Sequence, residues 1–137
     1  MIKQHSKTKQ EYRTGVAAVE LAVCLPVILV LILGTLQACS MFYLKQNLGV
    51  SAYEGIRRCV EYNSTPAQVE ATCLQVLADR RVIGGSVEIS PADYATRPPR
   101  TWITVTVTAP CNPNSPLRGG VYENRSLSTS ATMMKEF

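Results

Sequence analysis

The sequence has very little that a catalytic site would need. Among its 137 residues the only histidine is His5, so neither a histidine-based triad nor a histidine metal site can form farther along the chain. Neither phosphate-binding motif, G-x-x-x-x-G-K-S/T or G-x-G-x-x-G, occurs, and the cysteines form no C-x-x-C pair. The carboxylates are scattered, and each is most simply a surface charge. We therefore expect a protein that is not an enzyme, with no catalytic residue, cofactor, metal or small-molecule substrate.

Charge is absent from a long stretch that follows the N-terminal segment. No charged side chain occurs from Leu21 to Leu44, which is 24 residues. A helix of that length rises about 36 Å, enough to cross a hydrocarbon core of about 30 Å. The apolar part of a cleavable secretory signal has only about 7 to 15 residues. The sequence therefore predicts a transmembrane helix over residues 16–44, with a kink at Pro26.

Positive charge is concentrated ahead of this stretch. Residues 1–15 carry four lysine or arginine side chains against Glu11, a balance of +3, and the whole chain carries +4, which leaves +1 for residues 16–137. Basic residues before a first membrane span keep that end in the cytoplasm. We therefore predict a cytoplasmic leader over 1–15 and an extracytoplasmic head over 45–137. The nearly neutral remainder gives no reason to expect a nucleic-acid partner.

One acidic residue stands at the start of the apolar run. Glu20 follows Gly15 by five residues, and a carboxylate at the head of a membrane segment is costly and usually functional. A glycine followed by an acid in the fifth mature position resembles the processing site of type IV prepilins. The continuation Glu20-Leu21-Ala22 with Leu25-Pro26, and the later run of residues 52–57 (AYEGIR), resemble the TadE-like family of tight-adherence pilus proteins. The resemblance covers roughly residues 13 to 60.

This resemblance implies a pseudopilin or minor pilin that acts in biogenesis of a tight-adherence (Flp-type) pilus. Its partners would be the bacterial inner membrane, a prepilin peptidase that cuts between Gly15 and Val16, and other pilin or pilus-assembly subunits. The head would then be periplasmic. For Glu20 we predict an assembly role, in which its carboxylate pairs with the Val16 amine of a neighbouring subunit.

Two alternatives remain open from the sequence. The first is a single-pass membrane protein that does not assemble and whose periplasmic head binds a cell-envelope partner. The second is a lipoprotein, because Leu36-Gln37-Ala38-Cys39 loosely resembles a lipobox. The mature N-terminus separates the three readings: Val16 for the pilin, Met1 for the simple membrane protein and lipidated Cys39 for the lipoprotein.

The pattern of the remaining chain predicts an α+β, pilin-like head. The apolar spacing extends the first helix from about residue 15 to 62, and Thr65 and Pro66 mark the start of a second helix that ends at Gly84-Gly85. Alternation of apolar and hydroxyl side chains then indicates three strands, around residues 86–90, 101–109 and 127–133. We expect them to form one antiparallel sheet whose apolar face packs on the helices.

Three of the five cysteines lie in the predicted head. Cys59, Cys73 and Cys111 would reach an oxidising compartment, where a disulfide can form and persist. We predict one bridge, Cys73–Cys111, with Cys59–Cys73 as the competing pair. The long connection over residues 110–125 is interpreted either as a contact surface or as a poorly ordered loop.

Overall fold

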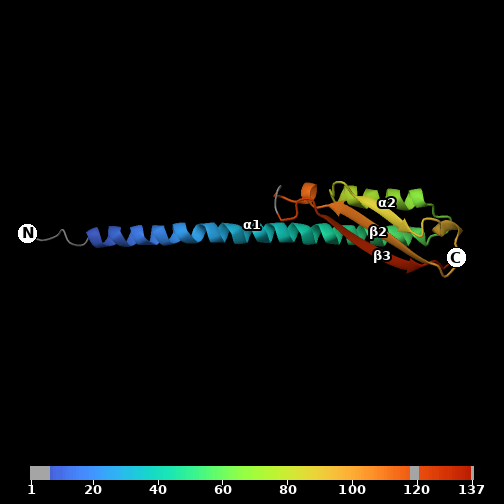
Figure 1. The fold of residues 1–137 in the computed structure, drawn as a ribbon, viewed down its shortest axis with the longest axis horizontal. Helices are drawn as coiled ribbons and strands as arrows, with labels where there is room; N and C mark the ends of the chain where they lie inside the picture. The colour runs from blue at the N-terminus through green and yellow to red at the C-terminus, as the bar shows by residue number, and fades with distance from the viewer. Residues whose placement is uncertain (1–6, 118–120, 137) are drawn as a thin grey trace, which may run out of the picture. The chain divides into compact units, whose positions relative to one another are not determined.

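The computed structural model describes residues 7–117 and 121–136, and the side chains from Gly15 onward within those ranges. It has the predicted α+β composition, with two α-helices and one three-stranded sheet in the described part of the chain (Figure 1). Two short 3-10 turns lie in the connections on either side of the second strand. The elements in chain order are α1 (Lys7–Cys59), α2 (Pro66–Asp79), β1 (Ser86–Ser90), η1 (Tyr94–Thr96), β2 (Trp102–Pro110), η2 (Asn112–Asn114) and β3 (Ser126–Met134).

The helix α1 is longer at its start and shorter at its end than the sequence predicts. It covers 53 residues, with Pro26 inside it, and it begins within the predicted leader. It stops at Cys59 because the chain has to turn before Pro66: Asn63 takes a left-handed conformation at φ 57°, and Thr65 is extended. A residue before proline is held out of the helical region, so α1 cannot continue through Thr65 into α2.

The chain divides into two compact units, one ending at Leu36 and one formed by Gln37–Phe137. In the second unit, α1 buries one side at intervals of three or four residues, with Met41, Leu44 and Leu48 among the first core residues. The compact unit therefore begins eight residues before the predicted head boundary at residue 45. The last part of the uncharged run, residues 37–44, belongs to the packed head because its buried side chains lie on the same side of α1 as Leu48.

The start of α2 follows the sequence prediction, whereas its end does not. Thr65 and Gln68 form a capping box, with Gln68 N donating to Thr65 Oγ1 at 3.4 Å and Thr65 N donating to Gln68 Oε1 at 3.3 Å. The helix ends at Asp79, well before Gly84. Arg81 takes the left-handed position at φ 58°, its N–H donates to Ala78 O, and Val82 N donates to Leu77 O at 2.9 Å. This is the Schellman arrangement, here with arginine where glycine is usual.

The sheet confirms the predicted strands and their antiparallel order. Its strands pair in the order β1-β2-β3, with Ile89 opposite Val105 and Val105 opposite Ala131. The inner side chains of β2 are completely buried against the helices: they are Ile103, Val105, Val107 and Ala109.

Gly55 is a point of close approach between α1, α2 and the sheet. A Cβ on Gly55 would overlap Cys73 Sγ of α2 and lie 3.2 Å from Val105 Cγ1 of β2. The absence of a side chain on α1 at this position is what lets α2 and the sheet pack here. Cys73 and Val105 are therefore fixed at the same level of the core.

Candidate functional site

The predicted cleavage residues lie at consecutive positions within α1. A Cβ on Gly15 would have no atom within 4 Å, and Val16 is exposed. The predicted scissile bond between them belongs to a regular helix. A peptidase needs an accessible backbone, so this turn has to unwind for cleavage, and glycine lowers that cost because it is a poor helix former by about 1 kcal/mol.

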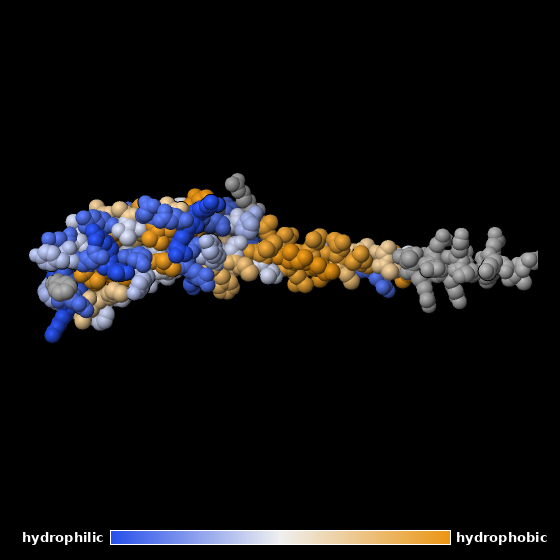
Figure 2. All heavy atoms as spheres, turned by 180° about the vertical axis from the view of Figure 1, so that it is seen from behind, coloured by the Kyte–Doolittle hydropathy of each residue, from blue (hydrophilic) through white to orange (hydrophobic). Residues whose placement is uncertain are grey.

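The first unit carries a long, mainly apolar surface from Val16 to Leu36. Every side chain in this range is exposed, and the visible face of this part is mostly hydrophobic in Figure 2. These 21 residues would rise about 31 Å as a helix, which matches a hydrocarbon core of about 30 Å. In the described part of the chain, this is the one helix long and apolar enough to cross a membrane. Such a surface requires lipid or other apolar helices around it.

Glu20 is the only charged residue on this apolar surface. Its side chain is exposed, and within residues 15–117 and 121–136 it makes no hydrogen bond and no ion pair. Val16 and Glu20 are four residues apart, which places them on the same side of α1, one turn from each other. The structure thus brings the predicted cleavage site and the predicted assembly residue onto one short helical segment.

The structure does not support the predicted Cys73–Cys111 disulfide. All five cysteines are free thiols, and Cys59, Cys73 and Cys111 are buried. Cys73 lies at the level of Val105, whereas Cys111 follows Val105 by six residues, or about 20 Å of extended chain. A disulfide needs Cβ atoms about 4 Å apart, so the two residues lie at different levels of the head. The competing Cys59–Cys73 pair is not bonded either.

The buried thiols have other partners. Cys73 Sγ donates to Ser51 O at 3.5 Å, and Ser51 Oγ donates to Cys73 O at 3.0 Å, so these two residues join α2 to α1. Cys59, which follows the predicted span by 15 residues, is buried in the core cluster that also contains Tyr94. Burial raises the pKa of the Cys59 thiol to about 11 and also raises the pKa of Cys73. These thiols therefore stay protonated near neutral pH, which removes the thiolate that a nucleophile would need.

Tyr94 is a core residue that the sequence did not reveal. It comes from the connection between β1 and β2, is only 1 % exposed, and places its hydroxyl 3.3 Å from Ser64 Oγ. A single tyrosine among polar residues gives no periodic signal.

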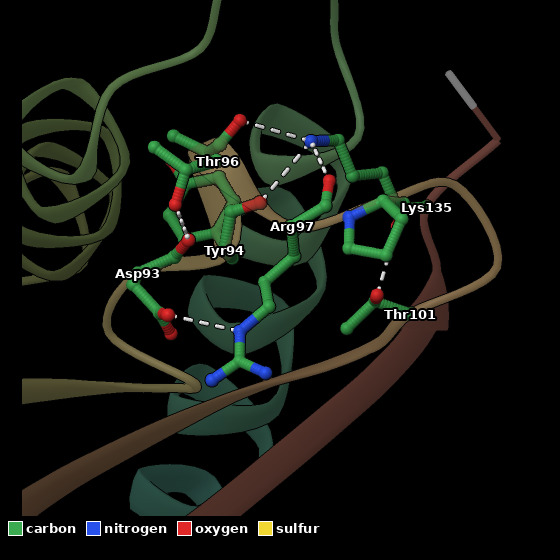
Figure 3. A network of polar contacts seen from close by, with 8 residues as sticks. Asp93, Tyr94, Thr96, Arg97, Thr101 and Lys135 are labelled. Carbon is green, nitrogen blue, oxygen red and sulfur yellow. Dashed lines mark hydrogen bonds and ion pairs between the residues drawn. The ribbon is translucent and has the colours of Figure 1, made fainter.

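A lysine fixes the turn that carries Tyr94 (Figure 3). Lys135 Nζ donates to the carbonyl oxygens of Tyr94, Ala95 and Arg97 at 3.1, 3.0 and 2.9 Å. Arg97 Nε in turn donates to Asp93 Oδ2 at 2.9 Å. Because an ammonium has three donors, Lys135 has none left for a ligand.

The connection after β2 is held to the head at its first turn. Asn114 Oδ1 accepts from Ile83 N at 2.8 Å, and Asn114 Nδ2 donates to Ile83 O and Pro110 O at 2.9 and 2.8 Å. The described part of this connection is therefore an anchored turn, and residues 118–120 lie outside the described residues. The contact-surface interpretation of residues 110–125 stays a prediction.

The raised thiol pKa values lead to a prediction about stability at high pH. In the unfolded chain the Cys59 thiol ionises near its ordinary pKa of 9.0, but in the folded head only near 11. The folded state therefore holds a proton that the unfolded state has lost, and the free energy of unfolding should fall as pH rises from 9 to 11, by up to about 3 kcal/mol. Denaturant titrations of the full chain in detergent at pH 7, 9 and 10.5 measure this, with Cys59→Ala as the control that should lose the part of the dependence that Cys59 contributes.

The same chemistry predicts slow alkylation of the folded head. At pH 8 the thiols of Cys59, Cys73 and Cys111 should react with iodoacetamide much more slowly in the folded protein than after unfolding, because they are buried and protonated. Recovery of a Cys73–Cys111 peptide under non-reducing conditions would contradict the free-thiol structure.

Together, the fold and the site define a class: a single candidate membrane helix that carries an α+β head. The segment with Gly15 and Glu20 also matches a family model. The model described as TadE-like protein matches residues 15–57, which confirms the resemblance seen in the sequence over that segment. No curated protein and no solved structure matches the chain significantly.

Proposed function

We propose that this chain is a pseudopilin or minor pilin of a tight-adherence pilus, cleaved between Gly15 and Val16 by a prepilin peptidase. The match to the TadE-like model carries this proposal, because it begins at the residue that precedes the predicted cut. The exposed apolar surface from Val16 to Leu36 supports it, since that surface would serve first as an inner-membrane anchor and then as an assembly element. In this reading the basic leader stays in the cytoplasm and the head is periplasmic.

In this proposal Glu20 selects the register in which subunits pack. Cleavage would create a positive amine on Val16, one helical turn from Glu20. A carboxylate among apolar helices is costly unless it is paired. Glu20 has no partner within the described part of its own chain, so the amine of a neighbouring subunit is the natural counter-charge.

We also propose that the head acts structurally and not as an enzyme. Its buried thiols stay protonated near neutral pH, and its lysine at position 135 is used completely by backbone carbonyls. In the described residues, no three His, Cys, Asp or Glu side chains gather to hold a metal ion. These observations support a small compact head whose role is structural.

The charge of Glu20 provides the test of assembly. Glu20→Gln keeps the size and hydrogen-bonding capacity of the side chain but removes its charge. We expect normal membrane insertion and nearly normal cleavage, with piliation and cross-linking to partner pilins reduced at least about tenfold, as for loss of one buried charge pair of 1.4 kcal/mol or more. Electron microscopy and in vivo cross-linking in the natural host measure both.

Glu70→Gln is the matched control, because Glu70 is an exposed carboxylate on α2. It should leave piliation unchanged. Normal piliation in the Glu20→Gln strain would leave Glu20 as an incidental interfacial charge. Normal piliation after deletion of the whole gene, with the protein cross-linked only to non-pilin envelope proteins, would favour the single-pass, non-assembling alternative.

A further inference from the structure

A hollow in the head collects two arginines and no acid. It lies where α1, the end of α2 and the turn η2 meet, and it has a volume of about 350 Å³. Its α1 wall includes Tyr43 and Asn47, the turn that follows α2 contributes Arg80 and Arg81, and residues 113–116 also line it. No aspartate or glutamate is among the described residues that line it. The hollow is therefore suited to an anion.

Arg80 is held in place by a buried amide. Its Nη1 donates to Asn47 Oδ1 at 3.0 Å, and Asn47 is only 1 % exposed. A guanidinium only donates, so the atom of Asn47 that faces it must be the oxygen. The amide nitrogen of Asn47 is then a buried donor, and it has no partner within the described residues. An unsatisfied buried donor is unfavourable by about 1 to 3 kcal/mol, so the orientation of the Asn47 amide is set by its contact with Arg80.

Arg81 adds a second guanidinium that is not otherwise engaged. Its side chain is exposed and makes no hydrogen bond or ion pair within residues 15–117 and 121–136. The left-handed conformation at the end of α2 places it next to Arg80 in the wall of the hollow. Two arginines in the wall of one hollow offer N–H donors to the oxygens of a phosphate, and each guanidinium can bind through two N–H groups.

The α1 wall of the hollow coincides with the end of the uncharged run. That run ends at Leu44, which lines the hollow together with Ser40 and Tyr43, and Lys45 is the first charged residue after it. Tyrosine and basic residues concentrate where a membrane helix leaves the hydrocarbon and enters the headgroup layer. The anion nearest to such a position is a lipid phosphate.

We propose that this hollow binds the phosphate of a phospholipid headgroup in the leaflet where α1 leaves the membrane. The proposal rests on the membrane-spanning part of the proposed function and is independent of pilus assembly. Arg80 and Arg81 bind the phosphate oxygens, Asn47 positions Arg80, and Tyr43 lies at the level of the headgroups. The head is thereby held against the membrane surface by a contact separate from the helix itself.

The test measures lipid retained by the full chain. The protein in detergent is titrated with phosphatidylglycerol and analysed by native mass spectrometry. We expect one lipid to bind with higher affinity than the rest, and we expect Arg80→Gln/Arg81→Gln to weaken it about 10- to 30-fold. Diacylglycerol, which lacks the phosphate, should show no such site. Arg57→Gln is the matched control, because Arg57 is an exposed arginine of the same unit that does not line the hollow.

Two further measurements keep the result interpretable. Arg81→Gln alone removes no hydrogen bond within the described residues, so it should keep the thermal stability of the wild type and still weaken the lipid about fivefold. Inorganic phosphate should compete only at millimolar concentration. Equal lipid retention by wild type and both variants would overturn the proposal, as would equal retention of diacylglycerol. If inorganic phosphate binds as tightly as the lipid, the hollow is a site for a free anion, and the lipid proposal is wrong.

Discussion

Gly15→Val is expected to leave the leader attached to the protein. A small residue before the scissile bond lets the backbone enter a narrow peptidase site, and a branched side chain obstructs it. The substitution also stabilises the helix around the bond, because glycine is about 1 kcal/mol worse than alanine in a helix and valine lies between them. Both effects act in the same direction. Intact-mass spectrometry of the protein from its natural host should find the Val16 terminus in the wild type and the Met1 terminus in the variant.

Gly34→Val is the matched control for this experiment. Gly34 lies in the same apolar part of α1, and a Cβ there would have no atom within 4 Å, as at Gly15. It should be cleaved like the wild type. A wild-type protein that keeps Met1 in the presence of the peptidase would exclude the processing proposal, and a lipidated Cys39 would favour the lipoprotein reading. A fully processed Gly15→Val protein would show that the glycine is not required.

Gly55→Val should unfold the head at a temperature at which the wild type is fully folded. The added side chain would overlap Cys73 Sγ and press on Val105, both of which are completely buried. Overpacked cores lose about 1 to 3 kcal/mol, and the loss should reach about 3 kcal/mol here because three elements would have to separate. Thermal unfolding of the full chain in detergent, followed by circular dichroism, measures the effect.

Gly49→Ala and a double variant test the cause of this loss. A Cβ on Gly49 would meet Thr129 Cγ2 at 3.7 Å, an ordinary contact, so this α1 substitution should be neutral or stabilise by up to about 1 kcal/mol. If the clash with Cys73 is responsible, Gly55→Ala together with Cys73→Ala should destabilise less than the sum of the two single variants. If the free-energy losses of the two single variants add up in the double variant, the clash with Cys73 is not the cause of the Gly55 effect.

Most of the fold was predictable because its signals are local. The capping box at Thr65 and Gln68 and the alternation along β2 each depend on neighbours in sequence, and the structure confirms both. The end of α2 was not predictable from these rules, because Arg81 occupies a left-handed position that usually takes glycine. The burial of Tyr94 was not predicted, because a single core residue in an irregular connection is not part of a repeating pattern of apolar side chains.

The sequence supports a candidate site only where a short motif carries it. Gly15, Val16 and Glu20 are proposed from their spacing, the family match covers these positions, and their roles stay predictions. The prediction of a Cys73–Cys111 disulfide was wrong because the sequence does not show where along the sheet α2 packs. In the structure α2 packs against Gly55, which places Cys73 beside Val105 and away from Cys111. The contact of Arg80 with Asn47 joins residues 33 positions apart, and no sequence pattern links them.

The order of the strands has a consequence for the time course of folding in the cell. Each strand pairs with its neighbour in sequence, so the sheet closes through two successive antiparallel pairings and needs no crossover connection, which favours rapid folding. The three buried thiols are open to oxidants only before that closure, and thiol oxidation takes seconds or longer. A head that closes first therefore keeps its cysteines reduced even in an oxidising compartment, and slowly folding variants are the ones that would acquire wrong crosslinks.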